Sequence, residues 1–123
     1  MHDRVMGEEF AYLSTTGRRS GQPHVIEIWF GEHAGTIYLL SGGGDRADWV
    51  RNLKVDPRVG IRLGGSRRLS PDGASGATAS LVSDPAEDTL ARQLLAAKYQ
   101  GWVPGRELSD WARTALVVAV RLS

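Results

Sequence analysis

Hydrophobic and polar residues alternate along several short segments of the chain, and this spacing predicts β-strands. The clearest case is HVIEIWF, residues 24–30, in which Ile26 and Ile28 fall on one face while Glu27 falls on the other. The closing segment, 114–122, is nearly all apolar, so we expect both of its faces to be covered. Six strands are predicted in this way: 10–16, 24–30, 36–42, 58–64, 77–83 and 114–122.

The spacing of three to four residues that is typical of helices occurs mainly in the second half of the chain. Residues 84–99 carry a complete set of start signals, with Asp84 as the N-cap, Pro85 in the first turn and Glu87 completing a capping box. A shorter amphipathic helix is predicted after Asp45, which we interpret as its N-cap. A single helical turn is expected over 109–113, turns over 31–35 and a turn-rich stretch over 64–76. Short strands joined by hairpins favour a mainly β fold, an antiparallel barrel or sandwich with helical insertions.

Composition narrows the class of protein without identifying it. The 123 residues suit one domain over 1–123, and 1–8 form a candidate disordered N-terminal segment. The net charge of +1 gives no general attraction to nucleic acid or to a membrane surface, so we expect neither as a partner. The chain has no cysteine and no apolar leader, which indicates a cytoplasmic protein. Its three histidines are too scattered to predict a metal site.

The stretch TTGRRSG, residues 15–21, puts two arginines at the tip of a predicted hairpin. Arg18 and Arg19 are permanently charged donors suited to phosphate or carboxylate, and the hydroxyl of Ser20 adds a further donor. Glycines let backbone N–H groups turn toward a ligand, and His24 follows closely enough to contribute. The alternative is a charged hairpin tip that only keeps the edge of a sheet soluble.

A second candidate is SGGGDRADW, residues 41–49, where a strand ends in glycines before a helix begins. A flat ligand could approach the main chain closely there, or the segment could be a flexible connection only. Four tryptophans provide flat surfaces that serve either as core or as a wall for a planar cofactor. Glu27 lies between isoleucines, and we interpret it as paired with Arg51 or Arg62, as exposed, or as a polar contact to a bound ring.

Three motifs in this order resemble one known family. LSTTGRRSGQPHVIEIWF, IYLLSGGG and DWVRNLKVDPRVGIRLG are similar to segments of the deazaflavin-dependent nitroreductases, which belong to the coenzyme F420-dependent reductases. Those proteins typically carry TTGRxSGxP and then W-x-x-NL-x-x-x-P-x-V, matched here by Trp49, Asn52, Leu53, Pro57 and Val59. The group has the pyridoxamine-phosphate-oxidase-like split β-barrel fold, so the resemblance implies a six-stranded antiparallel split barrel. Split barrels often pair, which makes a homodimer a candidate assembly.

The resemblance also implies a cofactor and positions for it. F420 is a deazaflavin with a phosphate and a glutamate tail. By position, Arg18, Arg19, Ser20 and His24 would hold the phosphate end. Ser41, Gly42 and Gly43 would approach the ring, with Trp29 and Trp49 nearby. The cofactor-binding set implied by the matching motifs is Thr16, Gly17, Arg18, Arg19, Ser20, Gly21, His24, Trp29, Ser41, Gly42, Gly43, Trp49 and Asn52.

This chain departs from the pattern at several positions. Gly42 and His24 stand where relatives often have basic residues, and Glu27 stands where a proline is common. These changes leave FMN open as the alternative cofactor. The implied function is an F420-dependent oxidoreductase, nitroreductase or quinone-reductase-like, that transfers hydride to an electron-poor enone, quinone or nitro compound. An FMN-binding oxidoreductase and a non-catalytic carrier of a cofactor or small ligand are the alternatives. No catalytic residue is assigned, although Tyr99 and Tyr38 are candidate proton donors.

Overall fold

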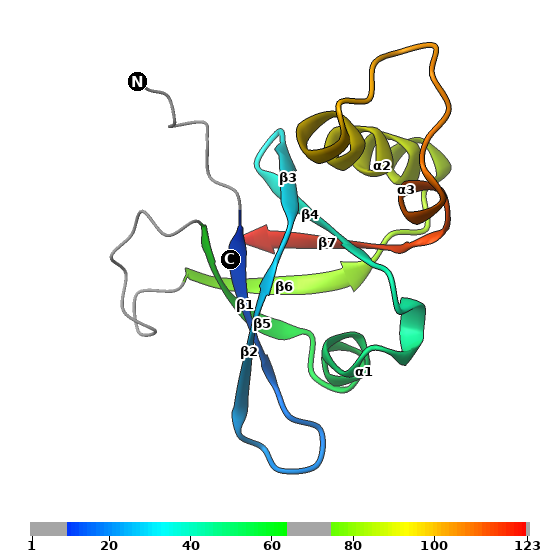
Figure 1. Cartoon of the computed structure of the whole chain (residues 1–123). Helices are drawn as coiled ribbons and strands as arrows, with labels where there is room; N and C mark the ends of the chain where they lie inside the picture. The colour runs from blue at the N-terminus through cyan, green and yellow to red at the C-terminus, as the bar shows by residue number, and fades with distance from the viewer. Residues whose placement is uncertain (1–9, 64–74, 123) are drawn as a thin grey trace.

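The structure, a computed structural model, describes residues 10–63 and 75–122, so the expectations for 1–8 and for most of 64–76 lie outside it. The described residues form one seven-stranded antiparallel sheet in the order β2-β1-β5-β6-β7-β4-β3 (Figure 1). Its strands are β1 (Ala11–Thr16), β2 (Pro23–Ile28), β3 (Phe30–His33), β4 (Thr36–Ser41), β5 (Arg58–Leu63), β6 (Ser75–Leu81) and β7 (Leu116–Leu122). The mainly β, antiparallel fold predicted from the sequence is confirmed.

The sheet curls into a barrel because its two edges are neighbours in the sequence. β2 and β3 form opposite edges of the sheet, yet only Trp29 separates them along the chain. The single strand predicted over 24–30 is therefore wrong, since the chain leaves β1 after Ile28 and joins β4 from Phe30 onward. This break accounts for the seventh strand. The turn predicted over 31–35 is correspondingly shorter, because β3 continues to His33.

The apolar residues of the sheet form two clusters, one on each of its faces. β4 and β7 contribute to both: Leu39 and Val118 lie in the interior cluster, while Tyr38 and Val117 lie in the outer one. The expectation that the last strand is covered on both faces is thus confirmed. Along β2, Ile26 and Ile28 pack against the interior cluster, as the alternation predicted, and Glu27 is exposed.

Helices cover the outer face and one side of the barrel, namely α1 (Asp48–Val55), α2 (Pro85–Gln100) and α3 (Asp110–Thr114), with a short 3-10 turn, η2 (Gly44–Arg46). α2 begins with Asp84 as its N-cap, as predicted, because the Asp84 carboxylate accepts a hydrogen bond from the Glu87 N–H at 2.9 Å. The Glu87 carboxylate accepts from Tyr38 and Arg121 instead of completing the predicted capping box. α1 begins at Asp48 after Ala47, so the prediction that Asp45 is its N-cap is wrong. Asp45 lies in η2 instead.

The helices occupy two separate places. Figure 1 shows α1 beside the β1–β2 hairpin and α2 with α3 beside β3, β4 and β7. Within the described residues, no helix is both long enough and apolar enough to cross a membrane.

Two residues of α2 fix the bend between β2 and β3 through hydrogen bonds. The Tyr99 hydroxyl accepts a hydrogen bond from the Phe30 N–H at 3.0 Å and donates one to the Phe30 carbonyl at 3.1 Å. Lys98 donates to the same carbonyl at 3.1 Å and lies 3.5 Å from the centre of the Phe30 ring. One residue at the bend is therefore fixed through both of its backbone polar groups, and this fixes the place of Trp29.

The β3–β4 hairpin turns through Ala34 and Gly35, which have φ angles of 52° and 82°. A two-residue turn of this kind requires positive φ at both positions, because its twist then matches that of the strands. Glycine adopts such a conformation freely, whereas in alanine the Cβ comes too close to the following carbonyl oxygen. The hairpin therefore carries local strain at Ala34.

We expect Ala34→Gly to stabilise the fold by on the order of 1 kcal/mol, which raises the melting temperature by about 3–6 °C in a domain of this size. Thermal unfolding followed by circular dichroism measures the change. Ala97→Gly, on the exposed side of α2, is the matched control and should destabilise by about 1 kcal/mol. Destabilisation by both substitutions would contradict strain at Ala34.

Candidate functional site

The predicted basic turn is a compact loop between β1 and β2. The Gly17 N–H donates to the Gln22 carbonyl at 2.8 Å, and the Gly21 N–H donates to the Gly17 carbonyl at 2.8 Å. Gly21 has a φ of 74°, a conformation that favours glycine. The loop therefore holds its shape through its own backbone bonds, with Arg18 and Arg19 at its tip.

Gly17 differs from Gly21 because two side chains approach it closely. A Cβ at this position would lie 2.6 Å from His24 Nε2 and 2.7 Å from Ser20 Oγ, well inside van der Waals contact. The Ser20 hydroxyl also accepts a hydrogen bond from the Gln22 N–H at 3.0 Å. His24 and Ser20 are thus brought together over a glycine that leaves room for them.

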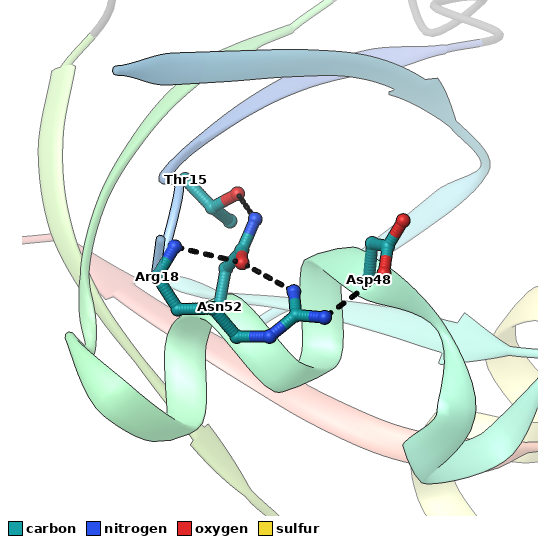
Figure 2. A network of polar contacts seen from close by, with 4 residues as sticks. All are labelled: Thr15, Arg18, Asp48 and Asn52. Carbon is teal, nitrogen blue, oxygen red and sulfur yellow. Dashed lines mark hydrogen bonds and ion pairs between the residues drawn. The ribbon is translucent and has the colours of Figure 1, made fainter. Parts of the chain in front are cut away.

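Arg18 is bound to α1 rather than extended into solvent (Figure 2). Asn52 Oδ1 accepts hydrogen bonds from the Arg18 backbone N–H at 3.2 Å and from Arg18 Nη1 at 2.8 Å. Asn52 Nδ2 donates to Thr15 Oγ1 at 3.1 Å, and Arg18 Nη2 forms an ion pair with Asp48 Oδ1 at 3.3 Å. Asn52 is only 3% exposed, so its buried amide ties the hairpin to the helix.

These residues surround a hollow of about 260 Å³, which we call the basic hollow. Its lining residues are Gly17, Arg18, Arg19, Ser20, His24, Asp48 and Asn52. Arg19 forms no ion pair with any residue of the described ranges, 10–63 and 75–122. Six of the predicted residues therefore meet here, whereas Asp48 was missed by the sequence reasoning. Its spacing of four residues from Asn52 on one helix face was the available signal.

A second hollow, of about 480 Å³, lies where β2 ends, and we call it the aromatic hollow. It is lined by Glu27, Ile28, Trp29, Leu40, Gln100 and Trp111. Trp29 stacks on Tyr99 with ring centres 4.2 Å apart and meets Trp111 edge-on at 5.5 Å. Trp29 was predicted for the site. Trp111 was not, because nothing in the sequence indicates that α3 returns to this bend.

The glycine segment runs between the two hollows. A Cβ on Gly42 would lie 3.3 Å from the Trp111 ring, which places this glycine against the aromatic hollow. Six residues later Asp48 lines the basic hollow. Ser41 is buried and donates to the Gly44 carbonyl at 2.9 Å, while Gly43 packs against Ala47. The predicted Ser41–Gly43 segment thus connects the hollows instead of lining either of them.

Glu27 belongs to a row of polar side chains across the outer face of three strands. In register, Glu27 lies opposite Tyr12, and Tyr12 lies opposite Arg62. The Tyr12 hydroxyl donates to Glu27 Oε2 at 3.0 Å, and Arg62 lies 4.4 Å from the centre of the Tyr12 ring. The hydrogen bond to Glu27, followed by the charge of that carboxylate, raises the pKa of Tyr12 above its ordinary value, and Arg62 opposes this shift. The structure shows Glu27 exposed, which is one of the three interpretations that the sequence left open.

Several other predicted residues lie away from both hollows. Trp49 packs against the interior cluster, and Thr16 ends β1 without lining either hollow. Tyr38, a candidate proton donor, is buried under α2 and donates to Glu87 at 2.6 Å. Burial and this hydrogen bond raise the pKa of Tyr38, which makes it a poorer acid. The hydroxyl of the other candidate, Tyr99, is occupied at the β2–β3 bend.

Solved structures with this fold come from several functional groups. A candidate 5-nitroimidazole antibiotic resistance protein from Bacteroides thetaiotaomicron superimposes with a TM-score of 0.72 at 17% identity, covering 100% of this chain and 81% of that one. A candidate pyridoxamine 5′-phosphate oxidase from Listeria innocua gives 0.66 at 16% identity, covering 96% and 86%. A protein named F420 reductase gives 0.61 at 18% identity, covering 94% and 87%.

These similarities establish the split-barrel architecture and nothing finer. Matches of the same fold also include haem-binding proteins, so the fold alone does not select a cofactor.

The sequence itself carries the family assignment. The model of one protein family, described as F420H2-dependent quinone reductase, matches residues 1–109. That range contains both hollows apart from Trp111, and it confirms the resemblance drawn from the three motifs. Because the match spans most of the 123 residues, the chain belongs to the F420H2-dependent quinone reductase family.

Proposed function

We propose that this protein is an F420-dependent oxidoreductase that delivers hydride to a flat, electron-poor acceptor such as a quinone, an enone or a nitro compound. The observation that carries the proposal is the pairing of two hollows of different chemistry, one basic and one aromatic. Both hollows include a residue of β2, His24 in the basic hollow and Glu27 in the aromatic hollow. A ligand with an anionic end and a flat ring fits such a pair. Family membership supports F420 as that ligand.

The basic hollow fits the phosphate end of the cofactor. Arg18 is ion-paired with Asp48 and hydrogen-bonded to Asn52, so its role is to position the turn. Arg19 then supplies the charge for a phosphate, while Ser20 supplies a hydroxyl. His24 and Ser20 meet over Gly17, so the imidazole and the hydroxyl are both close to the turn that would face the phosphate.

The aromatic hollow fits the ring end and the acceptor. When bound, the deazaflavin supplies the hydride, and the protein supplies position and electrostatics. Gly42 lets the main chain pack closely against Trp111, while the indoles of Trp29 and Trp111 give flat apolar surfaces. Flat apolar surfaces of this kind favour the binding of a planar ring. We name no residue of the chain as the donor of the proton that completes the reduction.

We expect tight binding of F420 and weak binding of FMN when each is titrated into the purified protein. Quenching of tryptophan fluorescence follows the titration, because Trp29 and Trp111 line the aromatic hollow. Reduced F420 should then be oxidised by a quinone or nitroaromatic acceptor, as its absorbance shows. If the protein binds FMN more tightly than F420, FMN takes the place of F420 as the proposed cofactor. Binding of F420 without turnover of any acceptor would make the protein a carrier.

Arg19→Ala should weaken F420 binding by about tenfold without changing the melting temperature, since an exposed cation that contacts phosphate is lost. Arg106→Ala removes another exposed arginine, from the loop before α3, and serves as the charge-matched control. The fluorescence titration compares the two variants. If both variants bind F420 as tightly as the wild type does, the basic hollow is not the site of the cofactor's phosphate.

Asn52→Ala should destabilise the fold by roughly 1–3 kcal/mol, because the buried Thr15 hydroxyl and the Arg18 N–H lose their partner. It should also weaken F420 binding, since the turn is no longer tied to α1. Urea unfolding gives the first effect and the fluorescence titration the second. Unchanged affinity in a folded variant would show that the turn needs no anchor.

A further inference from the structure

Glu27 is the one formal charge among the six residues that line the aromatic hollow. The other five are apolar, aromatic or an uncharged amide. Its carboxylate is exposed, so it keeps its hydration and has no buried counter-charge to neutralise it. A molecule that enters this hollow therefore meets apolar walls and one fixed negative charge.

The carboxylate is held in place by its neighbours on the sheet. Tyr12 donates to Oε2, which leaves Oε1 as an acceptor for another group. Arg62 is a cation of the same row and belongs to β5, on the other side of β1 from Glu27. Its guanidinium lies over the Tyr12 ring at 4.4 Å. The hydrogen bond from Tyr12 engages one oxygen of the carboxylate, and Glu27 is the charged residue among those that line the hollow.

We propose that the aromatic hollow binds flat aromatic molecules that carry a cationic substituent, such as a protonated amine, and that Glu27 sets this preference. The indoles of Trp29 and Trp111 give the affinity for the ring, and cations are also attracted to the faces of indoles. The carboxylate adds attraction for a positive substituent and repels a carboxylate-bearing molecule. The identification of this molecule as the hydride acceptor rests on the proposed function. Its binding does not.

The expected effect is modest because the carboxylate is exposed. At a separation of a few ångströms near the surface, one charge changes affinity by about three- to fivefold at low salt. The difference should shrink at about 0.5 M salt, where the screening length falls to a few ångströms. Affinity for the uncharged ring should not change with salt.

Three probes with the same ring test the proposal: 4-nitrobenzylamine, 4-nitrobenzyl alcohol and 4-nitrophenylacetate, which are cationic, neutral and anionic at pH 7. Each is titrated into nitrogen-15-labelled protein without any cofactor, and the four tryptophan indole N–H resonances are followed by NMR. We expect the resonances of Trp29 and Trp111 to shift, with affinity falling in the order amine, alcohol, carboxylate. Those of Trp49 and Trp102, which line neither hollow, should stay in place.

Glu27→Gln should remove the order among the probes and leave the affinity for the alcohol unchanged. Glu32→Gln makes the same change in charge at an exposed position of β3 outside both hollows, and it should preserve the order. Equal affinities of the wild type for all three probes would overturn the proposal. So would the same response of both variants, or shifts confined to Trp49 and Trp102. Because no F420 is present, a failed F420 titration would overturn the proposed function alone.

Discussion

The step of a single residue between β2 and β3 is the constraint on which the rest of this structure depends. Two strands joined by one residue can occupy opposite edges of a sheet only if the sheet curls until those edges meet. Closure creates the interior that the inward residues of every strand fill. It also places Trp29 at the junction of the edges, where β2, β4 and the end of α2 come together around the aromatic hollow. The barrel, its core and the aromatic hollow therefore all follow from the single-residue connection between β2 and β3.

The two hollows are stabilised by different physical means. The basic hollow depends on a buried amide, Asn52, which connects Thr15 and Arg18 to α1. The aromatic hollow depends on ring packing, with Trp29 between Tyr99 and Trp111. Directional hydrogen bonds would suit the phosphate proposed to bind at the basic hollow, because they fix the geometry of its partners. Ring contacts are tolerant of shape, which would suit the flat molecules proposed to bind there.

Much of the fold could be predicted from alternation, because residues on a strand either fill the interior or leave it. The same pattern hid the break at Trp29: Ile28 and Phe30 both point inward, so the alternation continues although the chain changes partners. The basic turn was recognisable since its residues are local in sequence. Trp111 was not, because only the tertiary fold brings α3 to the end of β2. Asp45 has the chemistry of a helix cap, but η2 intervenes before α1 begins.

The backbone of Phe30 links two parts of the molecule that could otherwise open independently. Its N–H and carbonyl are bound by Tyr99 and Lys98, which belong to the last turns of α2. If α2 undocks, both groups lose these partners at the point where the barrel is joined. The junction and the helix therefore form one cooperative unfolding unit, and the amide of Phe30 should exchange its hydrogen only as fast as α2 detaches.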